Sequence, residues 1–129
     1  MLTEKDAIQA VPPQGFVTEF VTHAVKQTTS PLSYHLGTAL TILGCTCPLN
    51  YGMNYAGRLR ANLFTLLVGR SGADMKSSAL GIGRDVLFEA AAPLIGDYPG
   101  SPEGLIDSLA RSPSQVIPIS EFGRFLAAA

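Results

Sequence analysis

The stretch that says most about the fold is residues 62–78, which read NLFTLLVGRSGADMKSS. From Leu63 to Val68 the residues are mainly apolar, as in a strand buried on both faces of a parallel sheet. A glycine-containing loop follows and ends in Lys76 and Ser77. In the regular phosphate-binding loop, GxxxxGKS or GxxxxGKT, backbone N–H groups and a helix N-terminus surround the phosphates, while the lysine and the hydroxyl serve phosphate oxygen and Mg²⁺. The stretch therefore predicts a degenerate form of this motif.

The residues after Lys76 predict the helix that the motif requires. Apolar side chains recur there at roughly helical spacing, although Gly81 and Gly83 lower the intrinsic helix propensity. Strand, loop and helix thus follow one another in the expected order.

The loop departs from the regular motif in three ways. Lys76 follows Gly69 by seven residues rather than six, and Met75 replaces the glycine before the lysine. Asp74 would repel a phosphate unless its carboxylate points outward or contacts a metal. A plain strand, turn and helix is therefore an alternative interpretation, in which the glycines supply permissive backbone angles and Lys76 is a solvated surface lysine.

A second apolar segment supports the motif. Residues 115–121, QVIPISE, end in Glu121, as does the strand that carries Mg²⁺-binding and water-activating acids in phosphate-loop enzymes. Ser120 stands where an Asp is usual, and its hydroxyl can hold a metal-bound water but cannot neutralise Mg²⁺. Pro118 cannot donate to a sheet ladder. The alternative is that Glu121 is a carboxylate at the N-terminus of a helix running from Phe122.

Four blocks of sequence together resemble the phage- and plasmid-type primase-helicase-like P-loop ATPases. They are residues 31–41 (PLSYHLGTALT), 62–78, 100–109 (GSPEGLIDSL) and 120–123 (SEFG). The resemblance implies an α/β fold, with a partial RecA-like or AAA-like parallel sheet preceded by two helices. It divides the chain into an N-terminal helical segment, 1–48, and a nucleotide-binding core, 49–129, that is incomplete at its C-terminus. It also implies an ATP-binding, helicase-like module of a phage or plasmid replication protein.

The resemblance also implies a set of site residues. Those that match the phosphate loop are Gly69, Ser71, Gly72, Lys76 and Ser77, and Glu121 matches the acid after the second strand. In the corresponding mechanism the loop and its lysine hold the β- and γ-phosphates of ATP, Ser77 ligates Mg²⁺ with help from Ser120, and Glu121 orients or deprotonates the attacking water. The rival hypothesis is a non-catalytic assembly or scaffold module that keeps a degenerate P-loop fold, which the changes at Asp74, Met75 and Ser120 favour.

The expected partners follow from the strands and the charge. A RecA-like sheet needs about five strands, whereas only Leu63–Val68, Val116–Ser120 and a short piece at Leu94–Ile95 can be placed. We therefore expect a fragment, a homo-oligomer or a partner chain that completes the sheet. The net charge is −1, so no global basic field recruits nucleic acid, and any DNA contact is local or lies in regions beyond this chain.

Helices are predicted on both sides of this core. One apolar face is formed by Phe16, Val17, Phe20, Val21, Ala24 and Val25. Ser30 caps a second helix that begins with Pro31, with an apolar stripe of Leu32, Leu36, Ala39, Leu40 and Leu43. Ser101-Pro102 begins another helix, which continues to about Arg111. Residues 49–59 predict an irregular hairpin, and Met1 to Gln14 a loose leader.

Composition and the remaining ligand-type residues restrict the function further. Hydrophobic residues make up 47% and charged residues 15% of the 129, which excludes a disordered tail. No apolar stretch is long enough to span a membrane and the N-terminus lacks a signal-peptide pattern, so we expect a cytoplasmic protein without a membrane partner. Cys45 and Cys47 are expected to be reduced, and His23 and His35 to be polar residues on amphipathic helices.

Overall fold

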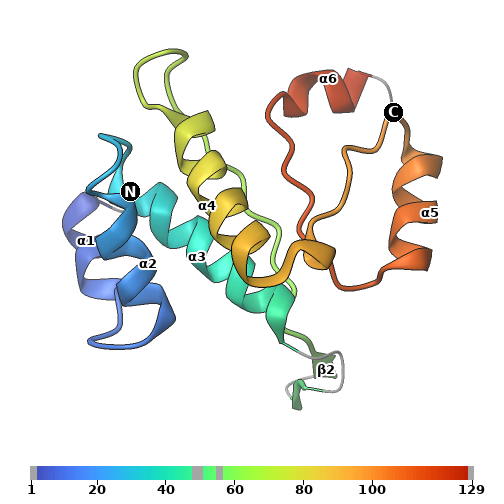
Figure 1. The fold of residues 1–129 in the computed structure, drawn as a ribbon, viewed down its shortest axis with the longest axis horizontal. Helices are drawn as coiled ribbons and strands as arrows, with labels where there is room; N and C mark the ends of the chain where they lie inside the picture. The colour runs from blue at the N-terminus through green and yellow to red at the C-terminus, as the bar shows by residue number, and fades with distance from the viewer. Residues whose placement is uncertain (1–2, 48–50, 55–56, 128–129) are drawn as a thin grey trace.

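The computed structural model describes residues 3–47, 51–54 and 57–127, and helices dominate this part of the chain. In chain order they are α1 (Glu4–Ala10), α2 (Phe16–Ala24), α3 (Leu32–Thr46), α4 (Lys76–Ala91), the 3₁₀ helix η1 (Ala92–Leu94), α5 (Pro102–Arg111) and α6 (Phe122–Ala127). Between α3 and α4, the short strands β1 (Met53–Asn54) and β2 (Arg58–Leu59) pair antiparallel. Figure 1 shows α3 and α4 at the centre, with α1 and α2 on one side and α5 and α6 on the other.

The hydrophobic core forms where α2 and α4 pack against α3. Its buried members are Val17, Phe20, Val21 and Ala24 of α2, Ala39 and Ile42 of α3, and Leu87 of α4. The apolar face predicted for α2 is therefore confirmed, with Phe16 and Val25 at its exposed margin. Helix α4 approaches α3 closely at Gly83. As a result, a Cβ atom at this position would overlap the methyl group of Thr38.

The buried face of α3 differs from the predicted stripe. Ala39 is buried as expected, and Leu32 and Leu36 pack against the core, but Leu40 and Leu43 are each 40% exposed. The other buried positions are His35, Thr38 and Ile42. Within the described chain the ring nitrogens of His35 have no hydrogen-bond partner. Desolvation by burial lowers the pKa of His35 against an opposing effect of Glu4, and this favours the neutral imidazole.

Two of the predicted peripheral elements are confirmed and one is wrong. Helix α5 begins with Ser101 as its N-cap, which accepts a hydrogen bond from the Gly104 amide at 3.1 Å. The β1–β2 hairpin lies within the predicted irregular hairpin, of which residues 49–50 and 55–56 lie outside the described chain. The leader is not loose, because Thr3 and Asp6 form a capping box that starts α1. Pro12 and Pro13 follow the end of α1 and prevent its continuation.

The predicted α/β fold with a parallel sheet is wrong for the described residues. The only sheet in the described chain is the antiparallel pair of β1 and β2. Two of the predicted strands meet at a single parallel bridge between Ile95 and Val116. This bridge has two hydrogen bonds, from Gly96 N to Val116 O at 2.9 Å and from Val116 N to Leu94 O at 2.7 Å. Both segments were predicted as strands, but only this isolated bridge forms and no ladder develops from it.

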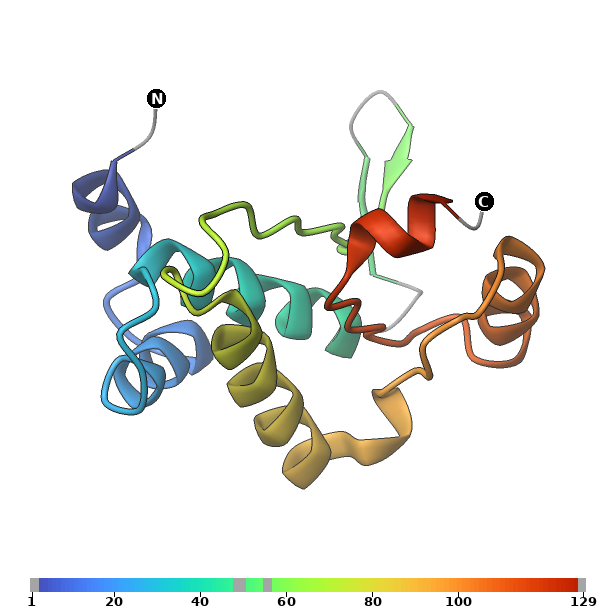
Figure 2. The same cartoon turned by 90° about the horizontal axis from the view of Figure 1, so that it is seen from above.

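The predicted central strand, residues 63–68, runs along α3 without joining a sheet. The hydroxyl of Thr65 lies 2.6 Å from that of Thr41, and the Tyr34 hydroxyl donates to the Val68 carbonyl at 2.7 Å. Phe64 is 99% exposed. A buried parallel strand needs a hydrogen-bonded neighbour on each side, and the described chain supplies neither. Figure 2 shows this green segment beside α3.

Candidate functional site

The loop between the extended segment and α4 has the backbone shape of a tight, glycine-dependent turn. Gly72 has a φ of +74°, and Met75, immediately before α4, has a φ of +47°, which is left-handed and unusual for a residue with a side chain. The Met75 carbonyl accepts hydrogen bonds from the amides of Ser78 and Ala79. Helix α4 therefore begins at Lys76, where the motif predicts that a helix should begin.

Lys76 folds back over the loop that precedes it. Its ammonium group donates to the carbonyl of Gly69 at 2.7 Å and to the carbonyl of Arg70 at 2.9 Å. The structure thus brings together Gly69 and Lys76, the first residue and the lysine of the predicted phosphate loop. The positive charge lies beside the N-terminus of a 16-residue helix, whose dipole also favours an anion.

Asp74 points into this loop. Its Oδ2 accepts a hydrogen bond from the Arg70 amide at 2.6 Å, and its Oδ1 lies 3.3 Å from the Arg70 guanidinium. The Arg70 amide, followed by smaller effects of the Arg70 guanidinium and Lys76, holds the pKa of Asp74 below its ordinary value. Gly69 has no room for a side chain, because a Cβ atom would overlap the Tyr34 hydroxyl and approach the carboxylate of Asp74.

Met75 is clamped by the connection between α2 and α3, a contact that sequence reasoning missed. Thr28 and Thr29 direct their hydroxyls at its sulfur, at 3.7 and 3.3 Å, and the Ser30 hydroxyl donates to its carbonyl at 2.8 Å. The prediction that Ser30 caps α3 is therefore wrong, and Pro31 is the N-cap. Tyr34 was also missed, although it lies in the first of the four sequence blocks.

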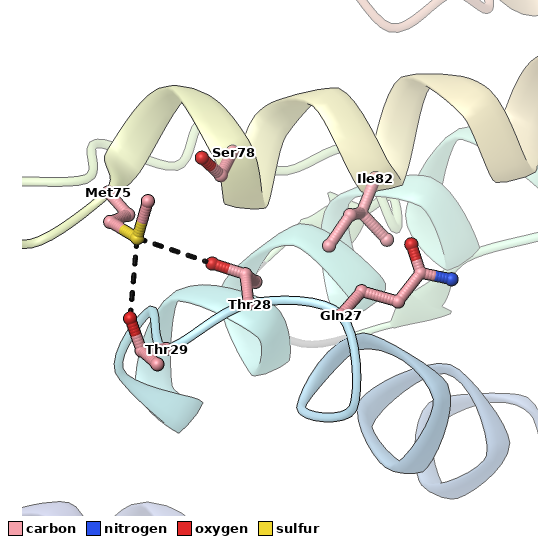
Figure 3. A pocket seen from close by; sticks show the side chains of 6 residues that line it. All are labelled: Gln27, Thr28, Thr29, Met75, Ser78 and Ile82. Atoms are coloured by element: carbon pink, nitrogen blue, oxygen red, sulfur yellow. Dashed lines mark hydrogen bonds between the residues drawn. The ribbon is translucent and has the colours of Figure 1, made fainter.

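An open hollow lies next to the clamp, between α4 and the α2–α3 connection. Its volume is about 330 Å³, and its lining residues are Gln27, Thr28, Thr29, Met75, Ser78 and Ile82. Figure 3 shows Thr28 and Thr29 facing Met75 from one side, with Ser78 and Ile82 on the helix opposite Gln27. The lining combines hydroxyl and amide groups with the apolar side chains of Met75 and Ile82.

The other predicted site residues lie in less defined surroundings. Ser71 is exposed on the turn, and Ser77 is exposed in the first turn of α4. Ser120 and Glu121 are exposed immediately before α6, and Figures 1 and 2 both place the start of α6 away from the turn before α4. Since α6 begins at Phe122, the position of Glu121 fits the alternative of a helix-terminal carboxylate.

The described part of the chain contains neither a metal-ligand cluster nor a membrane-spanning helix. Among residues 3–47, 51–54 and 57–127, no group of three or more His, Cys, Asp or Glu side chains gathers in a way that could hold a metal ion. Cys45 and Cys47 are not joined in a disulfide, and both are partly exposed rather than buried. In the described chain we also find no helix with the length and apolar character needed to cross a bilayer.

Comparison with protein-family models, with curated proteins and with solved structures found no match to this chain. The function is therefore inferred from the geometry of the loop, together with the resemblance carried by the four sequence blocks.

Proposed function

We propose that residues 69–77 bind the phosphate groups of a nucleoside triphosphate. The observation that carries this proposal is the placement of the Lys76 ammonium over the loop at the N-terminus of α4. Three features that favour an anion meet there: a cation, a helix N-terminus and a glycine turn. The sequence resemblance favours ATP among the nucleotides and a role in phage or plasmid replication.

Lys76, Ser77 and the neighbouring hollow each have a role in this proposal. Lys76 exchanges the carbonyls of Gly69 and Arg70 for oxygens of the β- and γ-phosphates, a stronger pairing because both partners are then charged. Ser77 lies in the first turn of α4. We assign to it the ligation of the Mg²⁺ that accompanies the phosphates, as the sequence resemblance implies. The hollow beside Met75 offers space for the nucleoside.

The proposal concerns binding and not hydrolysis. The segment that carries Ser120 and Glu121 lies away from the loop in both overall views. Activation of water by Glu121 and a contribution of Ser120 to Mg²⁺ binding therefore stay predictions from the sequence.

Titration of a fluorescent ATP analogue with Mg²⁺ tests the proposal. We expect the wild-type protein to bind it and Lys76→Ala to bind at least about tenfold more weakly, which corresponds to the loss of one hydrogen bond to a charged group. Lys5→Ala, which removes the same charge from an exposed site on α1, is the matched control and should bind like the wild type. Equal binding by wild type and Lys76→Ala, or binding by neither, would contradict the proposal.

A second candidate function is a non-catalytic assembly module. It is favoured by the extended segment 63–68, which is exposed at Phe64, Leu66 and Val68 and forms no ladder within the described chain. Such a strand is a template for pairing with another chain. This function does not depend on nucleotide binding, and the two can occur together.

A further inference from the structure

The carboxylate of Asp74 is bonded to groups of the loop that could also bind an anionic ligand. It accepts a hydrogen bond from the Arg70 amide at 2.6 Å and pairs with the Arg70 guanidinium at 3.3 Å. It also lies within the electrostatic influence of Lys76. A backbone amide and two cations of the loop thus already act on an anion that belongs to the protein.

A phosphate group that entered the loop would need the same donors. A carboxylate oxygen and a phosphate oxygen are both anionic acceptors, and two anions cannot share one set of donors without strong repulsion. Because Asp74 is held next to Arg70 by only three intervening residues, it is always present at a high local concentration. A ligand must therefore displace the carboxylate before it can use these donors.

We propose that Asp74 is an affinity-determining residue that competes, within the chain, with the phosphate groups of the ligand. This inference rests on the proposed function of the loop. It also identifies the ligand class that the loop selects: a polyphosphate that brings its own Mg²⁺, since several phosphate contacts and a divalent cation together offset the displacement and the repulsion. A single phosphate group makes too few contacts to replace the carboxylate.

The experiment compares wild type, Asp74→Ala, Asp74→Asn and Asp85→Asn in binding to ATP with Mg²⁺, inorganic triphosphate with Mg²⁺, and inorganic phosphate. Asp85 is exposed on α4, so Asp85→Asn removes the same charge from a position on that helix away from the loop. Asp74→Asn retains an acceptor for the Arg70 amide and serves as the second variant if Asp74→Ala fails to fold. Circular dichroism verifies the helix content of each protein.

We expect Asp74→Ala to bind ATP and triphosphate about tenfold more tightly than wild type, Asp74→Asn to show a smaller gain, and Asp85→Asn to match the wild type within about twofold. Inorganic phosphate should bind measurably only to the Asp74 variants. If wild type binds ATP and the Asp74 variants bind it equally or more weakly, the competition is disproved while the proposed function stands. If none of the four proteins binds ATP or triphosphate, both are disproved.

Discussion

Helix α4 and the extended segment 63–68 both carry large apolar side chains, but these side chains lie in opposite environments. Leu87, in the core, is 1% exposed, whereas Leu66 in the extended segment is 65% exposed. Both segments lie against α3. The difference shows that hydrophobic sequence alone does not determine burial, because the backbone must also be satisfied.

The physical reason lies in where each backbone finds its hydrogen bonds. A helix satisfies its own amides and carbonyls, so α2 and α4 need only one apolar face to pack on α3. An extended segment depends on neighbours for its backbone hydrogen bonds. In the described chain Tyr34 donates to the Val68 carbonyl, and Thr41 bonds only to the side chain of Thr65. Its outward side chains consequently lie in solvent.

The largest effect on the free energy of unfolding is expected when a leucine of the core and a leucine of segment 63–68 are each replaced by alanine. Leu87→Ala should lower the free energy of unfolding by about 2–5 kcal/mol, because it removes a fully buried side chain from the core. Leu66→Ala should change it by less than about 0.5 kcal/mol, as is usual for an exposed side chain. Urea unfolding followed by circular dichroism measures both. Equal losses would show that segment 63–68 is as well buried as the core.

The sequence predicts the elements whose signals are local. The apolar period of α2, the start of α4 at Lys76 and the Ser101 cap of α5 were all predicted correctly, since each depends on neighbouring residues. The parallel sheet depends on pairing between distant segments, which a period in one segment does not specify. The buried face of α3 was predicted only in part: Ala39 is in the core and Leu32 and Leu36 pack against it, but His35, Thr38 and Ile42 were not predicted. The reason is that α1, α2, α4 and the extended segment all contact this helix, so its apolar residues are not confined to one stripe.

The candidate site divides in the same way. The motif predicts a glycine turn followed by a lysine at the start of a helix. The structure has this turn at Gly72 and begins α4 at Lys76. The clamp of Ser30 on Met75 joins residues 45 positions apart, and no local signal reveals it. For Asp74 the sequence left open an outward or metal-bound carboxylate, whereas the side chain turns inward to the Arg70 amide.

A second, smaller effect on stability is expected from substituting two glycines of α4. Gly83 packs against α3, whereas Gly81 faces open space. Gly83→Ala should destabilise the protein by about 1–3 kcal/mol, because the new methyl group would overlap Thr38 of α3. Gly81 has nothing near its missing side chain, so Gly81→Ala should instead stabilise by about 0.5–1 kcal/mol through helix propensity. Thermal unfolding of both variants measures the difference. The same sign for both would mean that α3 and α4 do not approach closely at Gly83.

The smallest effect on stability, and the most informative one on assembly, is expected at Phe64. This side chain is 99% exposed on a segment, residues 62–68, that contains no charged residue to discourage pairing with another strand. Phe64→Lys should change the free energy of unfolding by less than about 0.5 kcal/mol but should reduce self-association. Phe88→Lys places the same charge on the exposed surface of α4 and serves as the control.

Sedimentation velocity over a range of concentrations distinguishes the possibilities. If the extended segment pairs between chains, the average mass of wild type and Phe88→Lys rises with concentration while Phe64→Lys stays monomeric. The reason is that a lysine at the centre of the strand would bring two like charges close together in an antiparallel pair of chains. A wild-type protein that remains monomeric at every concentration would show that segment 63–68 tolerates its exposure without a second chain, and the assembly function would then lose its support.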